Sequence, residues 1–183
     1  RLSWRNERNL YKRECGLCGR HIISIYSTDK PFQVYCNECY HSDKWDPVSY
    51  GMELDLEKPF LEQFKELQIR VPRLYAFVSR NVDSEYTNGA QENKNCYLIF
   101  VSDHNEDSMY SYGIFNCINT IDCHGCNDSE LCYESIDCNK CYRVFYSRNC
   151  ANSQDLYFCN NCVNCHDCIG STNLRNKQYY IFD

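Results

Sequence analysis

Every cysteine after residue 90 occupies a position that is divisible by three. The twelve are Cys96, Cys117, Cys123, Cys126, Cys132, Cys138, Cys141, Cys150, Cys159, Cys162, Cys165 and Cys168. Unrelated placements would scatter over all three phases, so the spacing indicates a repeated structural unit. This repeat constrains the fold more than any other feature of the chain.

A period of fifteen residues arranges this C-terminal body into five units. They begin at Tyr97, Tyr112, Asn127, Tyr142 and Tyr157. A repeat too short for a helical hairpin and rich in β-forming residues predicts a mainly β chain, a single-chain β-solenoid with about 15 residues per coil. Fifteen residues at about 3.3 Å each give a perimeter near 50 Å, so we expect a narrow interior.

A narrow lumen predicts small inward side chains on every third residue. The cysteines expected to line it as structural residues are Cys117, Cys123, Cys126, Cys132, Cys138, Cys141, Cys150, Cys162, Cys165 and Cys168. Two columns switch together between Cys117 with Cys123 and Ser102 with Ser108, which indicates facing pairs. A disulfide needs Cα atoms within about 7 Å, whereas facing β-layers stand about 10 Å apart, so we expect reduced thiols and a cytoplasmic protein.

Two further columns carry predictions about the outside of the coil. A stacked tyrosine ladder along one edge is predicted from Tyr97, Tyr112, Tyr142 and Tyr157. A repeated turn, in which the carboxylate caps backbone N–H groups, is predicted from Asp107, Asp122, Asp137, Asn152 and Asp167. A calcium ladder is the alternative, but each coil offers one carboxylate and not a cluster.

The run Cys159 to Cys168 has the pattern C-x2-C-x2-C-x2-C, which raises an iron–sulfur or thiol redox alternative. The bacterial ferredoxin run has three residues before its last cysteine and a proline after it, whereas here the gap is two and Ile169 follows. No thioredoxin-like βαβ pattern surrounds the pairs. Lumen packing explains these cysteines, so a metal-cluster or thiol redox protein is our third hypothesis.

Two C-x2-C pairs near the N-terminus have the spacing of a zinc ribbon. The ligands expected are Cys15, Cys18, Cys36 and Cys39. Between the pairs, His21 to Tyr26 and Phe32 to Tyr35 predict two short strands that form a hairpin. The pattern predicts one structural Zn²⁺, with two disulfides or free thiols as alternatives, and His21 and His41 outside the ligand set. Four cysteines close the shell, so no position remains for a catalytic water.

Charge is distributed unevenly along the chain. Residues 1–80 hold thirteen Lys and Arg against eleven Asp and Glu, and residues 97–171 hold three against ten. Of these two parts, only the N-terminal one therefore carries a net positive charge, which favours binding to nucleic acid. The candidate phosphate contacts are Arg1, Arg5, Arg8, Lys12, Arg13 and Arg20. A solvated arm is the alternative, because Glu7 and Glu14 dilute the charge.

One amphipathic helix of about three turns is predicted between these parts. Pro59 occupies its first position, apolar residues follow from Phe60 to Leu67 with helical spacing, and Val71 before Pro72 ends it. We expect it to cap the open end of the solenoid. The predicted domains are a zinc ribbon with a basic arm at 1–50, a linker and capping helix at 51–80, and a Cys-rich β-solenoid at 81–183.

The segment Arg5 to Pro47, with Leu10 to Arg13 and Ser42 to Pro47 among its motifs, resembles a family of uncharacterised proteins from candidate-phylum bacteria. The likeness continues through Asn95 to Tyr97 and Asn173 to Phe182. The family is often labelled CaiB/BaiF, after CoA-transferases; we interpret that label as misassigned, because nothing in this chain supports the activity. Members look as if they carry a further upstream knuckle and a downstream tail, so the resemblance implies a fragment here and brings no catalytic residues.

These patterns favour a non-enzymatic, zinc-binding scaffold that presents a β-solenoid to a protein partner. A nucleic-acid or ribosome-associated protein that uses the basic arm, and so binds RNA, is the alternative. No Ser-His-Asp set, phosphate loop or pair of catalytic carboxylates can be argued from the sequence. No apolar run approaches the about 18 residues of a membrane span, so no membrane partner is expected. The partner's identity and the oligomeric state are not predicted.

Overall fold

The structure is a computed structural model that describes residues 8–183. The chain divides into two compact units, which we call the head (through Phe77) and the solenoid (residues 78–183). The predicted class is confirmed: the protein is mainly β, with a cysteine cluster near the N-terminus and a β-solenoid of about eight coils. The predicted capping of the solenoid by the helix stays a prediction.

Strand pairing in the head differs from the sequence-based expectation. Strand β1 (Tyr11–Glu14) pairs antiparallel with β2 (His21–Ser24), while β3 (Val34–Tyr35) pairs parallel with β4 (Arg73–Leu74). The predicted hairpin between the His21 and Phe32 segments is therefore wrong. The knuckle at Cys15 closes its own tight turn through a hydrogen bond from its N–H to the Arg20 carbonyl (2.8 Å), so the nearest partner of β2 lies upstream.

Among the described residues, the helical segments of the head include α1 (Asn37–Tyr40), the 3₁₀ turn η2 (Pro47–Tyr50) and α2 (Phe60–Arg70). Helix α2 begins at Phe60, one residue after the predicted start at Pro59, which is its N-cap. It ends before Val71, as predicted, because the residue before a proline avoids helical backbone angles. Its buried side chain is Gln63, whose amide exchanges two 2.8 Å hydrogen bonds with the backbone of Asp55. The amide thus ties the preceding loop to the helix.

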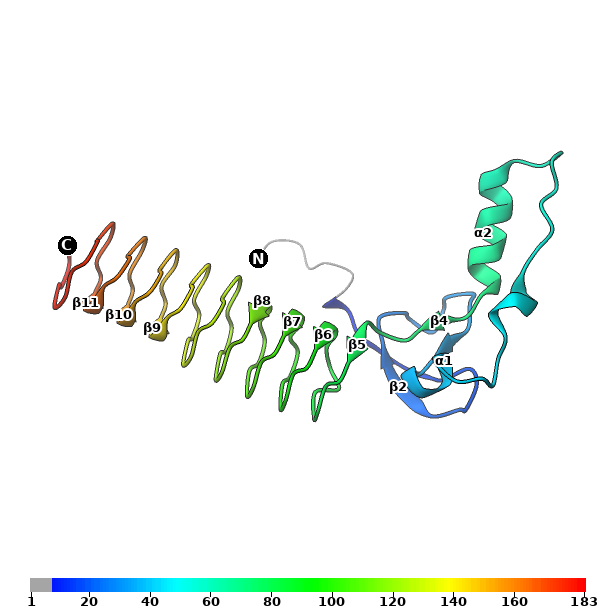
Figure 1. Ribbon diagram of the computed structural model, residues 1–183, viewed down its shortest axis with the longest axis horizontal. Helices are drawn as coiled ribbons and strands as arrows, with labels where there is room; N and C mark the ends of the chain where they lie inside the picture. The colour runs from blue at the N-terminus through cyan, green and yellow to red at the C-terminus, as the bar shows by residue number, and fades with distance from the viewer. Residues whose placement is uncertain (1–7) are drawn as a thin grey trace. The chain divides into compact units, whose positions relative to one another are not determined.

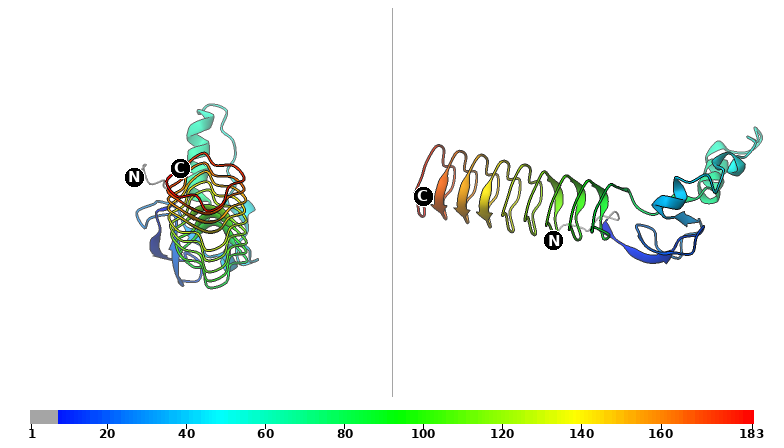
Figure 2. Two further views of the ribbon diagram at one scale, coloured as in Figure 1. Left: turned by 90° about the vertical axis from the view of Figure 1, so that its left-hand side faces the viewer. Right: turned by 60° about the horizontal axis from the view of Figure 1, so that its bottom comes forward.

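The solenoid is a stack of parallel coils (Figure 1). One sheet contains β5 (Val78–Ser79), β6 (Asn88–Gln91), β7 (Phe100–Asp103) and β8 (Tyr112–Phe115). Another contains β9 (Tyr142–Phe145), β10 (Gln154–Tyr157) and β11 (His166–Ile169). The two sheets lie on different sides of the coils, and single-residue bridges extend each ladder along its own side. In the left view of Figure 2, the successive coils have similar outlines, each displaced slightly from the one before it.

Each coil contains about twelve residues, so the predicted period of fifteen is wrong. Phe100 pairs with Tyr112, and Gln154 pairs with His166, each a step of twelve. Twelve and fifteen are both multiples of three, and either period keeps every third residue on the inside. The two periods differ only in which side of the coil a residue occupies, and interstrand hydrogen bonds decide that.

A three-residue unit forms each of the four sides of a coil, as Arg148, Asn149 and Cys150 illustrate. Arg148 bridges to the coils before and after it, Asn149 turns the corner with a φ of 53°, and Cys150 points inward with 1% exposure. Of the thirty non-glycine residues with positive φ within residues 8–183, sixteen are Asn or Asp. These two residue types tolerate left-handed backbone best, which explains their abundance at the corners.

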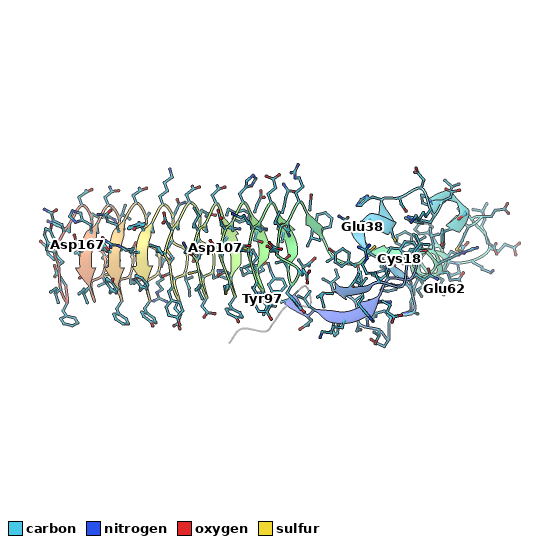
Figure 3. The ribbon with its side chains drawn as sticks, turned by 90° about the horizontal axis from the view of Figure 1, so that it is seen from below. Cys18, Glu38, Glu62, Tyr97, Asp107 and Asp167 are labelled. Carbon is cyan, nitrogen blue, oxygen red and sulfur yellow. The ribbon has the colours of Figure 1, made fainter. Side chains whose placement is uncertain are left out.

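The aspartate column predicted to form turns does lie at corners, but on different edges. Its members all have positive φ: Asp107, Asp122, Asp137, Asn152 and Asp167. Asp107 and Asp167 share one edge, five coils apart, and both are labelled in Figure 3. The side chain of Asp107 accepts a 3.2 Å hydrogen bond from Asn95 one coil earlier.

The lumen selects side chains that can both donate and accept hydrogen bonds. The Ser108 hydroxyl donates to the carbonyl of Glu106 (3.0 Å) and accepts from the N–H of Thr120 in the next coil (3.2 Å). In several coils the inward residue one coil earlier is a serine, whose hydroxyl accepts the N–H of the inward residue, as at Thr120, Cys123 and Cys141. Serine, threonine, asparagine and cysteine fit this requirement within a narrow interior.

Candidate metal centre and interaction surfaces

Four cysteine sulfurs converge in the head: those of Cys15, Cys18, Cys36 and Cys39. All four lie within 4.8 Å of one another, and the sulfurs of Cys18 and Cys36 are 3.9 Å apart. A tetrahedral ion with metal–sulfur bonds of about 2.3 Å sets its ligands about 3.8 Å apart. The cluster can therefore hold a metal ion.

Two local turns bring these sulfurs together. The first pair lies in the hairpin between β1 and β2, and the second lies on α1, where Cys36 is the N-cap. The N–H of Cys36 donates to the sulfur of Cys15 at 3.2 Å. Burial raises the pKa of Cys15, but the N–H groups of Cys18, Cys36 and Leu17 together outweigh it and lower the pKa to about 6. The thiolate, which is the metal-binding form, is thereby favoured.

Trp45 forms the aromatic wall beside this cluster. Its ring lies 5.5 Å from Tyr35, 5.4 Å from Tyr40 and 5.9 Å from Tyr50, and its Nε1 donates to the Tyr40 carbonyl at 3.0 Å. Trp45 packs against the buried group formed by Tyr35 and the cysteines Cys15, Cys36 and Cys39. Trp45 was not among the predicted site residues, although a tryptophan six residues after Cys39 was a usable signal.

An ion pair joins the two knuckles across the surface. Arg20, beside the first pair, donates to Glu38 of α1 through two contacts of 3.0 and 2.9 Å. Cys18 and Glu38 are both labelled in Figure 3. Glu38 holds one end of the bidentate pair, and Cys18 is the exposed member of the metal cluster.

The proposed nucleic-acid contacts separate into different roles. Arg1 and Arg5 lie outside the described residues. The guanidinium of Arg13 donates to the carbonyls of Tyr26 (3.4 Å) and Ser27 (3.1 Å), and that of Arg20 pairs with Glu38. Lys12 is exposed on β1, and Arg8 is half-buried. Arg13 and Arg20 therefore support the fold of the head. His21 and His41 are exposed and outside the cluster.

All ten cysteines predicted to line the lumen are buried, with exposed fractions of at most 3%. Cys96 and Cys159 are buried as well; the prediction omitted them although they share the same phase. None of the sixteen cysteines forms a disulfide. The pair Cys117 and Cys123 is separated by half a coil of twelve, so its members lie on opposite sides.

The four cysteines of the ferredoxin-like run line the lumen within a single coil. They follow one another every three residues, so each belongs to a different side. Among residues 8–183, three or more metal-ligating side chains converge only at the head cluster.

The predicted tyrosine ladder is wrong, because fifteen residues make one coil plus one side. Tyr97 and Tyr157 share an outer column, whereas Tyr112 and Tyr142 bridge on other sides. The true column, which we call the apolar column, contains Tyr97, Met109, Ile121, Tyr133, Phe145, Tyr157, Ile169 and Ile181. Tyr97 projects from the edge of the coils in Figure 3. Phe145 and Tyr157 stack at 5.1 Å.

No model of a known protein family matches this sequence, and no curated protein matches it. The resemblance to the candidate-phylum family therefore stays a prediction. Within residues 8–183, none of the helices has the length and apolar character needed to cross a membrane.

Proposed function

We propose that this protein is a non-enzymatic scaffold, in which a zinc ion stabilises the head and the outer face of the solenoid binds another protein. The observation that carries this proposal is the apolar column, which continues without a charged residue from Tyr97 to Ile181. A stable solenoid does not require that character on its outside, because outward side chains contribute little to lumen packing.

Zinc is the ion that suits the head cluster best. Four thiolates from two short turns form a closed tetrahedral shell, the arrangement of structural zinc sites. With every coordination position taken by sulfur, the ion would contribute folding free energy and leave no position for a substrate. A structural role for the metal therefore supports the non-enzymatic part of the proposal.

The apolar column has the composition of a protein interface. Its tyrosines, phenylalanine and methionine are residue types enriched at interface cores. Tyr157 is 38% exposed and Ile169 is 41% exposed, and the neighbouring corner residue Phe158 is 62% exposed. Monomeric proteins rarely expose a long contiguous apolar patch, so a partner that covers the column would remove this surface from water.

A protein partner in a reducing compartment is also consistent with the thiols. Sixteen free cysteines would be prone to oxidation in the secretory pathway, where disulfides form readily. A cytoplasmic location therefore belongs to the same proposal. Purification with and without reductant, followed by counting of free thiols in protein taken directly from cells, tests it.

The interaction is tested by affinity capture with matched variants of the full chain. Tyr133→Lys with Tyr157→Lys disrupts the apolar column, and Asn139→Lys with Ala151→Lys adds the same charge to another outer column. We expect a specific protein to be recovered with the wild type and the control, and to be lost with the column variant. Equal recovery with both variants would contradict the assignment of the surface.

The same affinity capture distinguishes the proposed protein binding from the nucleic-acid alternative. Phosphate contacts release counterions, so RNA bound through the basic arm would dissociate steeply as salt rises. A protein held by the apolar column would resist salt, because burial of apolar surface does not depend on charge. Recovery of RNA in a salt-sensitive form, with no change in the column variant, would favour the alternative.

A further inference from the structure

The apolar column forms one surface with the corner residues that directly follow its members. We call them the following corners: Leu98, Tyr110, Asp122, Glu134, Tyr146, Phe158, Gly170 and Phe182. Hydrogen bonds between coils hold them in register, as from the N–H of Tyr146 to the Tyr133 carbonyl at 3.0 Å. The ring of Tyr133 lies 5.4 Å from that of Tyr146, which stacks on Phe158 at 5.0 Å. The two columns therefore form a surface two side chains wide, which we call the aromatic stripe.

The aromatic stripe is large enough to bury in a stable dimer. Tyr110 is 52% exposed and Tyr146 is 45% exposed, beside the exposed residues of the apolar column. Aromatic side chains have about 150–250 Å² of surface each, so the stripe between Tyr97 and Ile169 leaves about 800 Å² of apolar surface in water. A specific protein interface buries about 800 Å² on each partner.

A second solenoid matches the repeat of this surface. The members of the stripe recur once per coil, and one coil rises about 4.8 Å along a stack of parallel strands. A helix turns once every 5.4 Å or so, and its side chains would drift by about half a coil over four turns. A second copy of the chain has the same rise, so every coil can meet its equivalent in the same way.

We propose that the aromatic stripe binds a second copy of this chain, face to face, with the two solenoid axes parallel and the coils in register. This inference rests on the proposed function, because it names the partner of the apolar column. A two-fold axis along the solenoid direction relates the copies, so both contribute the same patch. Each following corner then meets, in the same coil of the second copy, the corner that lies two residues before the apolar column.

Charge is compatible with this parallel orientation. The corners two residues before the apolar column, which we call the preceding corners, are Asn95, Asp107, Asn119, Leu131, Arg143, Asp155, Asp167 and Tyr179. In the parallel dimer, Asp122 meets Asn119 of the second copy, whose amide can donate to the carboxylate. Arg143 meets Tyr146, and the guanidinium can lie over the ring. None of the eight pairs of facing corners brings like charges together.

The antiparallel orientation is less favourable. With all eight coils overlapping and the axes reversed, preceding corners face preceding corners. Asp107 then meets Asp167 of the second copy, and the two-fold axis repeats this contact. Like charges that face each other across an interface oppose association, so the parallel orientation is favoured.

The mass of the purified full chain in solution tests the dimer. Light scattering during size-exclusion chromatography in reductant measures the mass, and sedimentation equilibrium gives the dissociation constant. For the wild type we expect twice the mass of one chain. Tyr133→Lys with Tyr157→Lys should raise the dissociation constant by about 100-fold or more, because the dimer would bury four unpaired charges. The control, Asn139→Lys with Ala151→Lys, adds the same charge to another side and should stay a dimer.

One position distinguishes the two orientations. Leu131 meets Glu134 of the second copy in the parallel dimer, but it meets Arg143 in the antiparallel one. A lysine fits this left-handed corner, as Lys140 shows with a φ of 52°. At low salt, we expect Leu131→Lys to bind its second copy about 2- to 10-fold more tightly than the neutral variant Leu131→Gln, because two exposed ion pairs form per dimer.

The results separate this inference from the proposed function. A wild-type monomer, or a dimer that the Tyr133 and Tyr157 variant leaves intact, would overturn the inference. If the wild type is a monomer and that variant still loses a different captured protein, the proposed function stands without the dimer. Equal capture by both lysine variants contradicts the proposed function itself. If the column variant does not fold, the Leu131 variants decide, since equal or weaker binding by Leu131→Lys excludes the parallel dimer.

Discussion

The side-chain oxygen of Asn93 accepts two hydrogen bonds from Asn105 in the next coil, one from its backbone N–H at 3.0 Å and one from its side-chain amide at 2.8 Å. Asn105 repeats the arrangement by accepting the N–H of Cys117 at 2.9 Å. This buried amide ladder continues the ladder of backbone hydrogen bonds into the lumen.

Replacement of Asn105 by alanine should destabilise the solenoid strongly. The change leaves the N–H of Cys117 without its acceptor in a buried site, so the free energy of unfolding should fall by about 2–4 kcal/mol. The matched control is Asn160→Ala, which removes an exposed amide and should cost about 0.5 kcal/mol or less. Urea unfolding measures both, and equal losses would contradict the ladder's role.

Serine should replace cysteine in the lumen at little cost, whereas the head should not tolerate it. In Cys117→Ser with Cys123→Ser, each new hydroxyl can donate to the carbonyl two residues earlier, as Ser108 and Ser111 do, so we expect a loss of about 1 kcal/mol or less. Cys36→Ser with Cys39→Ser removes half of the metal shell and should unfold the head. Thermal melts in reductant, with near-ultraviolet dichroism of Trp45 as the signal from the head, test both. A lumen pair as damaging as the head pair would show that lumen packing is not the role of those thiols.

Substitutions at corners should change stability according to how well the new residue tolerates a left-handed backbone. Val101 turns a corner with a φ of 53°, which is costly for a β-branched side chain. Val101→Asn should therefore raise the free energy of unfolding by about 1 kcal/mol, and the reverse change at an equivalent corner, Asn149→Val, should lower it by about 1–2 kcal/mol. The same sign for both substitutions in urea unfolding would contradict this account.

Thiol reactivity should separate the two classes of cysteine. Burial raises the pKa of Cys117 to about 11 and that of Cys132 to about 12, so both stay protonated at pH 8 and should resist iodoacetamide in the native protein. After a chelator removes the metal, Cys15 and the exposed Cys18 should be alkylated first. Mass spectrometry of peptides gives the order of labelling. Labelling of the lumen cysteines before the head cysteines would contradict it.

The sequence by itself determined that every third residue of the solenoid points inward. It also determined which cysteines form the metal cluster. The phase of Cys96 through Cys168 assigned every third residue to the interior, because a three-residue side with one left-handed corner repeats that phase locally. The two C-x2-C pairs likewise specified their sulfurs through short turns. The limits of α2 followed from Pro59 and Pro72, because a proline ring restricts its own backbone angle and those of the residue before it.

Only the tertiary structure decided which residues share a side. Tyr97 pairs with Met109 and not with Tyr112, because the coil closes after four sides, and closure depends on hydrogen bonds between residues twelve apart. The same holds in the head, where β3 pairs with β4 from far along the chain. A local pattern is unchanged by any coil length that is a multiple of three. Nonlocal hydrogen bonds were needed to choose among those lengths, and that choice placed the residues of the apolar column on one side of the coils.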